Sequence, residues 1–125
     1  MNDKKVVVIT GAARGLGRAG AERFLSSGGW KTALFDVNAE QLEQTAKELG
    51  EKYGAENVLW LKVDITSGES VDASMKDVIA KFGRIDALIN NAGITRDAML
   101  HKMQEHDWDM VLNVNLKGAF LCTRA

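Results

Sequence analysis

The sequence contains no proline, a single cysteine and no excess of either charge. The single cysteine, Cys122, cannot form a disulfide within the chain, and no group of Cys and His residues has the spacing of a metal site. We therefore expect no bound metal and a reducing compartment, with the cytoplasm as the default location. The 16 Lys and Arg residues nearly balance the 17 Asp and Glu residues, giving a formal net charge of -1. Because no basic cluster is present, we expect neither nucleic acid nor a membrane as a partner.

Long hydrophobic runs are also missing. The first run, in KVVVIT (5–10), is far too short for a signal peptide or a membrane span, and no later run approaches the required length. With 125 residues, 46% of them hydrophobic, the chain can bury one modest core and is too short for two ordinary domains. We expect a soluble, unprocessed chain that forms a single domain over residues 1–125.

Short hydrophobic segments alternate with longer amphipathic ones, which is typical of β-α units. Strands are predicted over 5–10, 31–36, 57–64 and 85–90. Helices are predicted over about 15–27, from Asn38 to Tyr53, from Thr66 to Phe82, and from about 105 to 120. Asn38 would cap the second helix, and Thr66 with Glu69 would form a capping box for the third.

Right-handed crossovers would stack these units into a parallel sheet with helices on both faces. In a doubly wound dinucleotide fold the four strands would lie in the order 3-2-1-4. The predicted fold class is α/β, a Rossmann-like doubly wound parallel sheet. The final segment, FLCTRA, still has a helical pattern. We therefore expect the sheet to be truncated after the fourth strand and the helix that follows it.

Three glycines follow the first predicted strand, in ITGAARGLG (9–17). Gly11 would turn the chain off the strand, Gly15 would let a pyrophosphate approach the backbone, and Gly17 would let the helix pack closely on the sheet. The helix N-terminus would offer free N–H groups and the positive end of its dipole to phosphate. Roughly 20 residues further on, Asp36 ends the second strand, where its carboxylate could accept both hydroxyls of an adenosine ribose. Together these features favour a dinucleotide site.

Each feature also has an ordinary structural explanation. Glycine-rich turns close many β-α loops, and an acidic residue at a strand end is often only solvated. The spacing G-x-x-x-G-x-G differs from the commoner G-x-G-x-x-G, and no Gly-Lys-Ser/Thr follows as in a Walker loop. Hydrolysis of a nucleoside triphosphate is therefore not expected.

Four segments together resemble the short-chain dehydrogenases/reductases. They are TGAARGLG (10–17), VDIT (63–66), NNAG (90–93) and NVNLKGAF (113–120), which looks like the family's fifth helix. Within the family, NNAGITRDAML and DWDMVLNVNLKGAF look most like the 3-oxoacyl-carrier-protein reductases and acetoacetyl-CoA reductases. The resemblance implies an NAD(P)-dependent oxidoreductase that acts on 3-oxoacyl thioesters when complete.

The resemblance also implies roles for individual residues. The residues expected to bind the cofactor are Gly11, Arg14, Gly15, Leu16 and Gly17 at the pyrophosphate and adjoining riboses, Asp36 at the ribose, Asp64 and Ile65 at the adenine, and Asn91, Ala92 and Gly93 along the adenosine ribose. Asn115 is expected to hold a water of the catalytic proton relay. Ordinary alternatives stay open: Asp64 could cap the approach to a helix, Asn91 could belong to a turn, and Asn115 could be a surface residue.

Two charged residues give opposite indications for the cofactor. Asp36 favours NAD, because its carboxylate would repel the 2′-phosphate of NADP. Arg14 stands at a position that the family often uses to bind that phosphate. Since a long guanidinium side chain can turn to solvent more readily than a short carboxylate, we expect NAD, with NADP possible.

The family's proton donor is missing from this sequence. It is a tyrosine followed four residues later by a lysine, whereas Tyr53, the only tyrosine, is followed by Asn57. The family's catalytic serine follows a fifth strand, which is also absent. We expect a cofactor-binding N-terminal half that is inactive by itself, with a non-catalytic nucleotide-binding or scaffold module as the alternative. A methyl donor-binding transferase fits the glycines less well. An exposed edge at the fourth strand and an apolar face on the last helix predict a homo-oligomer.

Overall fold

Four parallel strands form the centre of the structure, a computed structural model that describes residues 4–91. They are β1 (Lys5–Thr10), β2 (Trp30–Asp36), β3 (Val58–Lys62) and β4 (Ala87–Ile89), in the order β3-β2-β1-β4. Val8 of β1 pairs with Ala33 of β2 on one side and with Leu88 of β4 on the other. The predicted strand order and fold class are confirmed.

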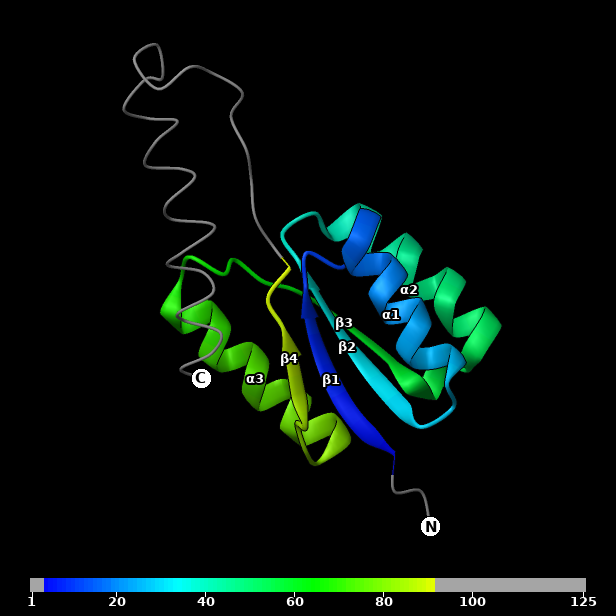
Figure 1. The fold of residues 1–125 in the computed structure, drawn as a ribbon. Coiled ribbons are helices and arrows are strands. Elements are labelled where there is room, and N and C mark those ends of the chain that lie inside the picture. Colours follow the sequence, from blue (N-terminus) through cyan, green and yellow to red (C-terminus); the bar gives the residue numbers. More distant parts are fainter. Residues whose placement is uncertain (1–3, 92–125) are drawn as a thin grey trace, which may run out of the picture.

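Helices cover both faces of this sheet (Figure 1). They are α1 (Gly15–Ser26), α2 (Ala39–Tyr53) and α3 (Gly68–Phe82), with a short 3-10 turn, η1 (Ala55–Asn57), before β3. Because side chains alternate along a strand, β1 sends Val7 and Ile9 to the face of α1 and α2, and Val6 and Val8 to the face of α3. All four valine and isoleucine side chains are buried, so β1 fits a central strand with a hydrophobic cluster on each side.

Helix caps set where two of the helices begin. The Asn38 side chain accepts a hydrogen bond from the Gln41 backbone N–H at 3.1 Å, which confirms the predicted cap of α2. The predicted capping box of α3 is wrong. The cap is Ser67, whose hydroxyl accepts from the Ser70 N–H, because Thr66 donates both its N–H and its hydroxyl to Asp64.

Two strands are shorter than expected. Asn57 belongs to η1 and donates from its side chain to the Tyr53 carbonyl, so β3 begins one residue later. β4 has only three residues. In front of it, Asp86 accepts a hydrogen bond from the Val6 N–H at 2.8 Å through its side chain, and this contact fixes the start of β4 against β1.

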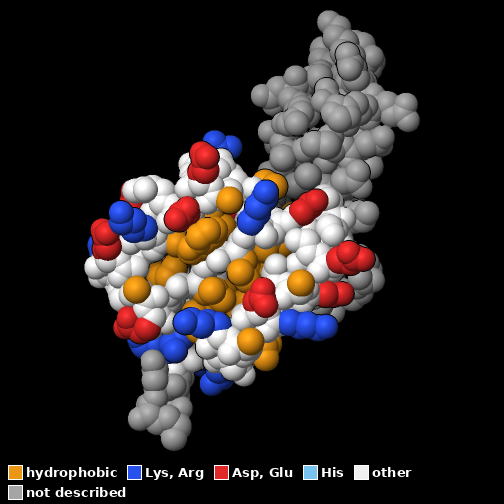
Figure 2. All heavy atoms as spheres, turned by 180° about the vertical axis from the view of Figure 1, so that it is seen from behind, with side chains coloured by type: hydrophobic (Ala, Val, Ile, Leu, Met, Phe, Trp, Pro, Cys, Tyr) orange, Lys and Arg blue, Asp and Glu red, His pale blue; other side chains and the backbone are white. Residues whose placement is uncertain are grey.

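Both outer strands of the described sheet have exposed side chains. On β3, Trp60 is 37% exposed, and on β4, Ile89 is 40% exposed. Seen from behind, hydrophobic side chains gather near the middle of the molecular surface (Figure 2). Lys62, an exposed charge at the end of β3, is a residue type that discourages pairing with foreign strands. None of the helices within residues 4–91 combines the length and the hydrophobicity that crossing a membrane needs.

Candidate functional site

The loop after β1 brings the predicted glycines to the carboxyl edge of the sheet. Gly11 and Gly15 have φ values of 64° and 59°, in the left-handed region that residues with a side chain rarely adopt. A Cβ built on Gly15 would have nothing within 4 Å. The surface over Gly15 is therefore open to a ligand that approaches the backbone.

Gly17 has the opposite environment. A Cβ at this position would lie 2.1 Å from the Gly11 carbonyl oxygen and 2.7 Å from the Asn91 side-chain nitrogen. The first turn of α1 thus packs directly on the backbone at the end of β1. This is the close helix–sheet contact expected of Gly17, and it places the start of α1 against the loop.

Asn91 joins the end of β4 to the same loop. Its side-chain Nδ2 donates to the Gly11 carbonyl at 3.2 Å, and its backbone N–H donates to the Thr10 hydroxyl at 2.9 Å. The Thr10 hydroxyl in turn donates to the Ile89 carbonyl at 3.3 Å. Asn91 therefore supports the glycine loop in this structure, and its expected contact with a ribose stays a prediction.

Asp36 reaches the loop from β2. One carboxylate oxygen accepts from the Ala13 N–H and the other from the Asn38 N–H, each at 3.0 Å. A carboxylate can accept about four hydrogen bonds, so each oxygen retains the capacity for one more. The expected contact of Asp36 with a pair of ribose hydroxyls is compatible with these bonds and stays a prediction.

The start of α1 is exposed where a phosphate would bind. Arg14, Gly15 and Leu16 are all exposed, and the Leu16 side chain is 84% exposed. Arg14 occupies the N-cap position and its side chain makes no capping hydrogen bond. Since the first N–H groups of a helix have no partner within the helix, they are available to an anion here.

The described residues after β3 show a more ordinary role for Asp64. Its Oδ1 accepts from the Thr66 N–H at 2.9 Å and from the Thr66 hydroxyl at 2.6 Å, as in a turn that leads into a helix. The Ile65 side chain is buried in the cluster beneath α3. The adenine contacts expected of Asp64 and Ile65 stay predictions. Ala92, Gly93 and Asn115 lie outside the described residues.

Sequence reasoning missed two threonines that support the loop. Thr10 ends β1, and Thr45 on α2 donates from its hydroxyl to the Ala13 carbonyl at 2.5 Å. The sequence did show that Thr45 is a polar residue in the hydrophobic stripe of its helix, which indicates a buried hydroxyl with a hydrogen-bond partner. Its partner could not be read from the sequence, because it is 32 positions away.

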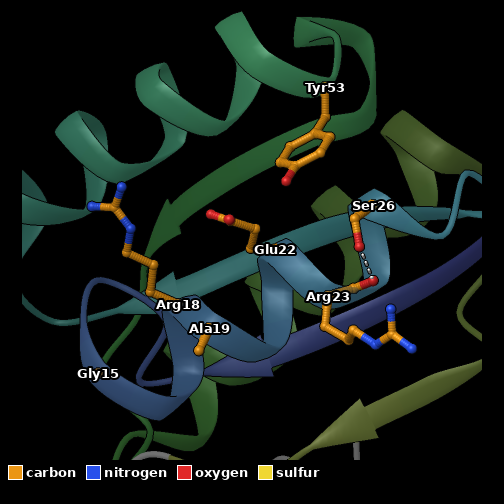
Figure 3. A pocket seen from close by; sticks show the side chains of 7 residues that line it. All are labelled: Gly15, Arg18, Ala19, Glu22, Arg23, Ser26 and Tyr53. Atoms are coloured by element: carbon orange, nitrogen blue, oxygen red, sulfur yellow. Dashed lines mark hydrogen bonds between the residues drawn. The ribbon is translucent and has the colours of Figure 1, made fainter.

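A shallow groove that starts at Gly15 lies along α1, facing α2 (Figure 3). Tyr53 points toward α1 across this groove. Two exposed ion pairs flank it, Arg18 with Glu48 and Lys52 with Glu22. Hydrogen bonds from Gln44 and Arg18 hold the pKa of the Glu48 carboxyl below its usual value. Within residues 4–91, no cluster of His, Cys, Asp and Glu could hold a metal ion.

The glycine loop, the open helix N-terminus and the acidic end of β2 have the arrangement of a dinucleotide fold. The sequence profile of the short chain dehydrogenase family matches residues 5–125. The chain belongs to this family. Its fold and the resemblance found in its four motifs are thereby confirmed.

Relatives with known names include several oxidoreductases. The chain is 43% identical over 121 residues to the (2S)-[(R)-hydroxy(phenyl)methyl]succinyl-CoA dehydrogenase subunit BbsD of Thauera aromatica, covering 97% of this chain and 48% of that protein. It is 44% identical over 120 residues to the 3-oxoacyl-[acyl-carrier-protein] reductase FabG of Thermotoga maritima, covering 96% and 48%. The chain thus spans about half the length of the curated relatives it matches.

Solved structures agree with this relationship. A short chain dehydrogenase/reductase from Burkholderia phymatum in complex with NAD is 35% identical, with a TM-score of 0.91, covering 98% of this chain and 43% of that one. The 3-ketoacyl-(acyl-carrier-protein) reductase from Brucella melitensis complexed with NADH is 35% identical, with a TM-score of 0.87 and coverage of 96% and 47%.

Proposed function

We propose that this chain is the cofactor-binding part of an NAD(P)-dependent oxidoreductase that acts on 3-oxoacyl thioesters. The main support is the glycine loop, which Asp36 holds on one side and Asn91 on the other, in front of an exposed helix N-terminus. Phosphate oxygens would accept hydrogen bonds from the N–H groups at the start of α1. When the cofactor is bound, its nicotinamide ring would accept or donate the hydride of the reaction.

NAD is the proposed cofactor, with NADP as the less favoured choice. The Asp36 carboxylate would accept from the ribose hydroxyls and would repel a 2′-phosphate, since like charges a few ångströms apart repel strongly in a site of low dielectric constant. Structural relatives were solved with NAD, NADH, 5-hydroxy-NADP and NADPH, which supports a nicotinamide dinucleotide, and the choice of NAD among them rests on Asp36. Arg14 is exposed at the loop and would partly offset the repulsion of a 2′-phosphate.

The proposed substrate class is supported by relatives. Two of them are named 3-oxoacyl-[acyl-carrier-protein] reductase, and a third is named (2S)-[(R)-hydroxy(phenyl)methyl]succinyl-CoA dehydrogenase subunit, so the three names share an acyl thioester. In this proposal Asn115 positions a water of the proton relay. The sequence contains no Tyr-x-x-x-Lys that could donate the proton to a ketone. We therefore expect the 125-residue chain to bind the cofactor without turning over a substrate.

Binding and turnover assays test this proposal. We expect isothermal titration calorimetry to detect NAD binding, and we expect no oxidation of NADH in the presence of a 3-oxoacyl thioester. Asp36→Ala should weaken NAD binding and lower the preference for NAD over NADP by about 10-fold or more, because it removes charge-assisted hydrogen bonds. Asp77→Ala, which removes an exposed carboxylate from α3, is the matched control. An unchanged preference in Asp36→Ala would contradict the assignment of this residue.

Self-association belongs to the same proposal. In the described sheet β4 has no strand beyond it, and its Ile89 is 40% exposed. An exposed strand edge readily pairs with another chain. We expect light scattering of a concentrated solution to report a dimer or larger species, and a uniform monomer would contradict this part of the proposal.

A further inference from the structure

One buried hydroxyl supports the glycine loop from behind. Thr45 lies on α2 and is 1% exposed, and its hydroxyl donates to the carbonyl of Ala13, which is 2% exposed. No water can replace this donor without a cavity, because both groups are enclosed by the cluster beneath α1 and α2. The position of the Ala13 carbonyl therefore depends on Thr45.

Ala13 also holds the acidic residue of the site. Its N–H donates to one oxygen of Asp36, while the neighbouring Ala12 N–H donates to the Phe35 carbonyl at 3.1 Å. The second oxygen of Asp36 accepts from Asn38, the residue that caps α2. Both oxygens of the Asp36 carboxylate are thus held from α2. The cap residue Asn38 binds one oxygen directly, and Thr45 supports Ala13, whose N–H binds the other.

We infer that Thr45 is a positioning residue that sets the preference of this site for NAD over NADP. The inference rests on the proposed function, because it assumes that the loop binds a nicotinamide dinucleotide. Without the Thr45 hydroxyl, the buried Ala13 carbonyl loses its donor and the loop relaxes toward a new partner. The Ala13 N–H then moves away from Asp36, and the carboxylate, held by the Asn38 N–H alone, loses its fixed orientation.

Movement of the carboxylate has opposite effects on the two cofactors. NAD loses the hydrogen bonds from its ribose hydroxyls, whereas NADP is relieved of repulsion at its 2′-phosphate. The dissociation constant of NADP divided by that of NAD therefore falls. A residue that only stabilised the loop would weaken both cofactors by the same factor and would leave this ratio unchanged.

Thr45→Val removes the hydroxyl and keeps the shape of the side chain. We expect the NADP-to-NAD ratio of dissociation constants, measured by calorimetry on the 125-residue chain, to fall roughly 3- to 10-fold, the effect of one lost hydrogen bond. Thr45→Ser keeps the donor and should retain the ratio. If Thr45→Val does not fold, Thr45→Cys provides the same comparison, because a thiol is a weak donor.

Thr32→Val is the matched control. Thr32 is also fully buried, and its hydroxyl has no hydrogen-bond partner in the described part of the chain. This variant should leave the ratio unchanged. The inference is overturned if Thr45→Val binds both cofactors with the original ratio, or if Thr45→Ser shifts the ratio as far as Thr45→Val. Failure of the unsubstituted chain to bind either cofactor would instead overturn the proposed function, and this inference with it.

Discussion

The contact between Gly17 and the end of β1 gives a sharp prediction for Gly17→Ala. The new Cβ would lie 2.1 Å from the Gly11 carbonyl oxygen, whereas real Cβ atoms keep at least 3.0 Å from such neighbours. The obstructing atom belongs to the backbone, so no side chain can turn away. The start of α1 and the end of β1 must therefore move apart.

The net cost of this movement can be estimated from two unfavourable contributions and one favourable one. Forcing an extra methyl group into a closely packed contact costs about 1–3 kcal/mol. Separation also strains the hydrogen bond from Asn91 to Gly11, worth roughly 1 kcal/mol. Alanine in a helix regains about 0.5–1 kcal/mol over glycine. We expect Gly17→Ala to lower the free energy of unfolding by about 1–3 kcal/mol.

Gly20→Ala is the matched control, because it makes the same change in the same helix. A Cβ at Gly20 would meet nothing within 4 Å, so this variant should gain about 0.5–1 kcal/mol from helix propensity alone. Urea unfolding of the 125-residue chain, followed by circular dichroism, measures both changes. Equal stabilisation by the two substitutions would refute the close contact on which the geometry of the loop depends.

Three further predictions concern a core residue, a charged residue and an exposed residue. Thr32→Val should raise the free energy of unfolding by about 1 kcal/mol in a urea titration, because it removes a buried hydroxyl that has no partner among residues 4–91. The hydrogen bond from Arg84 is the larger cause, and the one from the Val6 N–H the smaller cause, of a pKa of Asp86 below its ordinary value of 3.8. The ionised Asp86 therefore stabilises the fold above about pH 4. This contribution is lost as the pH falls through the lowered pKa. Asp86→Asn should therefore flatten the dependence of the urea midpoint on pH below about 4, and a slope equal to that of the unsubstituted chain would count against this role. Leu16→Ser should leave the free energy of unfolding unchanged within about 0.5 kcal/mol, because the side chain is exposed. It should weaken NAD binding about 5-fold in calorimetry, because we propose that Leu16 covers the bound cofactor, and unchanged affinity would contradict that role.

The parts of the fold that follow from local chemistry could be predicted from the sequence. The hydrophobic run over 5–10 predicted β1, and Asn38 predicted the start of α2. Gly83 ends α3 in the left-handed conformation that a helix C-terminus favours. The strand order followed from the doubly wound dinucleotide fold that the β-α pattern indicated.

The parts that depend on distant partners could not be predicted. Thr66 was predicted to cap α3, but the Asp64 carboxylate already binds Thr66, and the cap is Ser67 instead. The bond from Asn91 to Gly11 joins residues 80 positions apart. Such contacts form only when parallel strands bring their carboxyl ends to one edge, so the residue types indicated a site but did not reveal its supporting hydrogen bonds.

The central claim is that the loop after β1 binds the diphosphate of a nicotinamide dinucleotide. Isothermal titration calorimetry of the 125-residue chain with NAD, and separately with NADP, tests it most directly. We expect one saturable site per chain that binds NAD more tightly than NADP. A sample that is folded by circular dichroism and releases or absorbs no heat with either cofactor would contradict the claim.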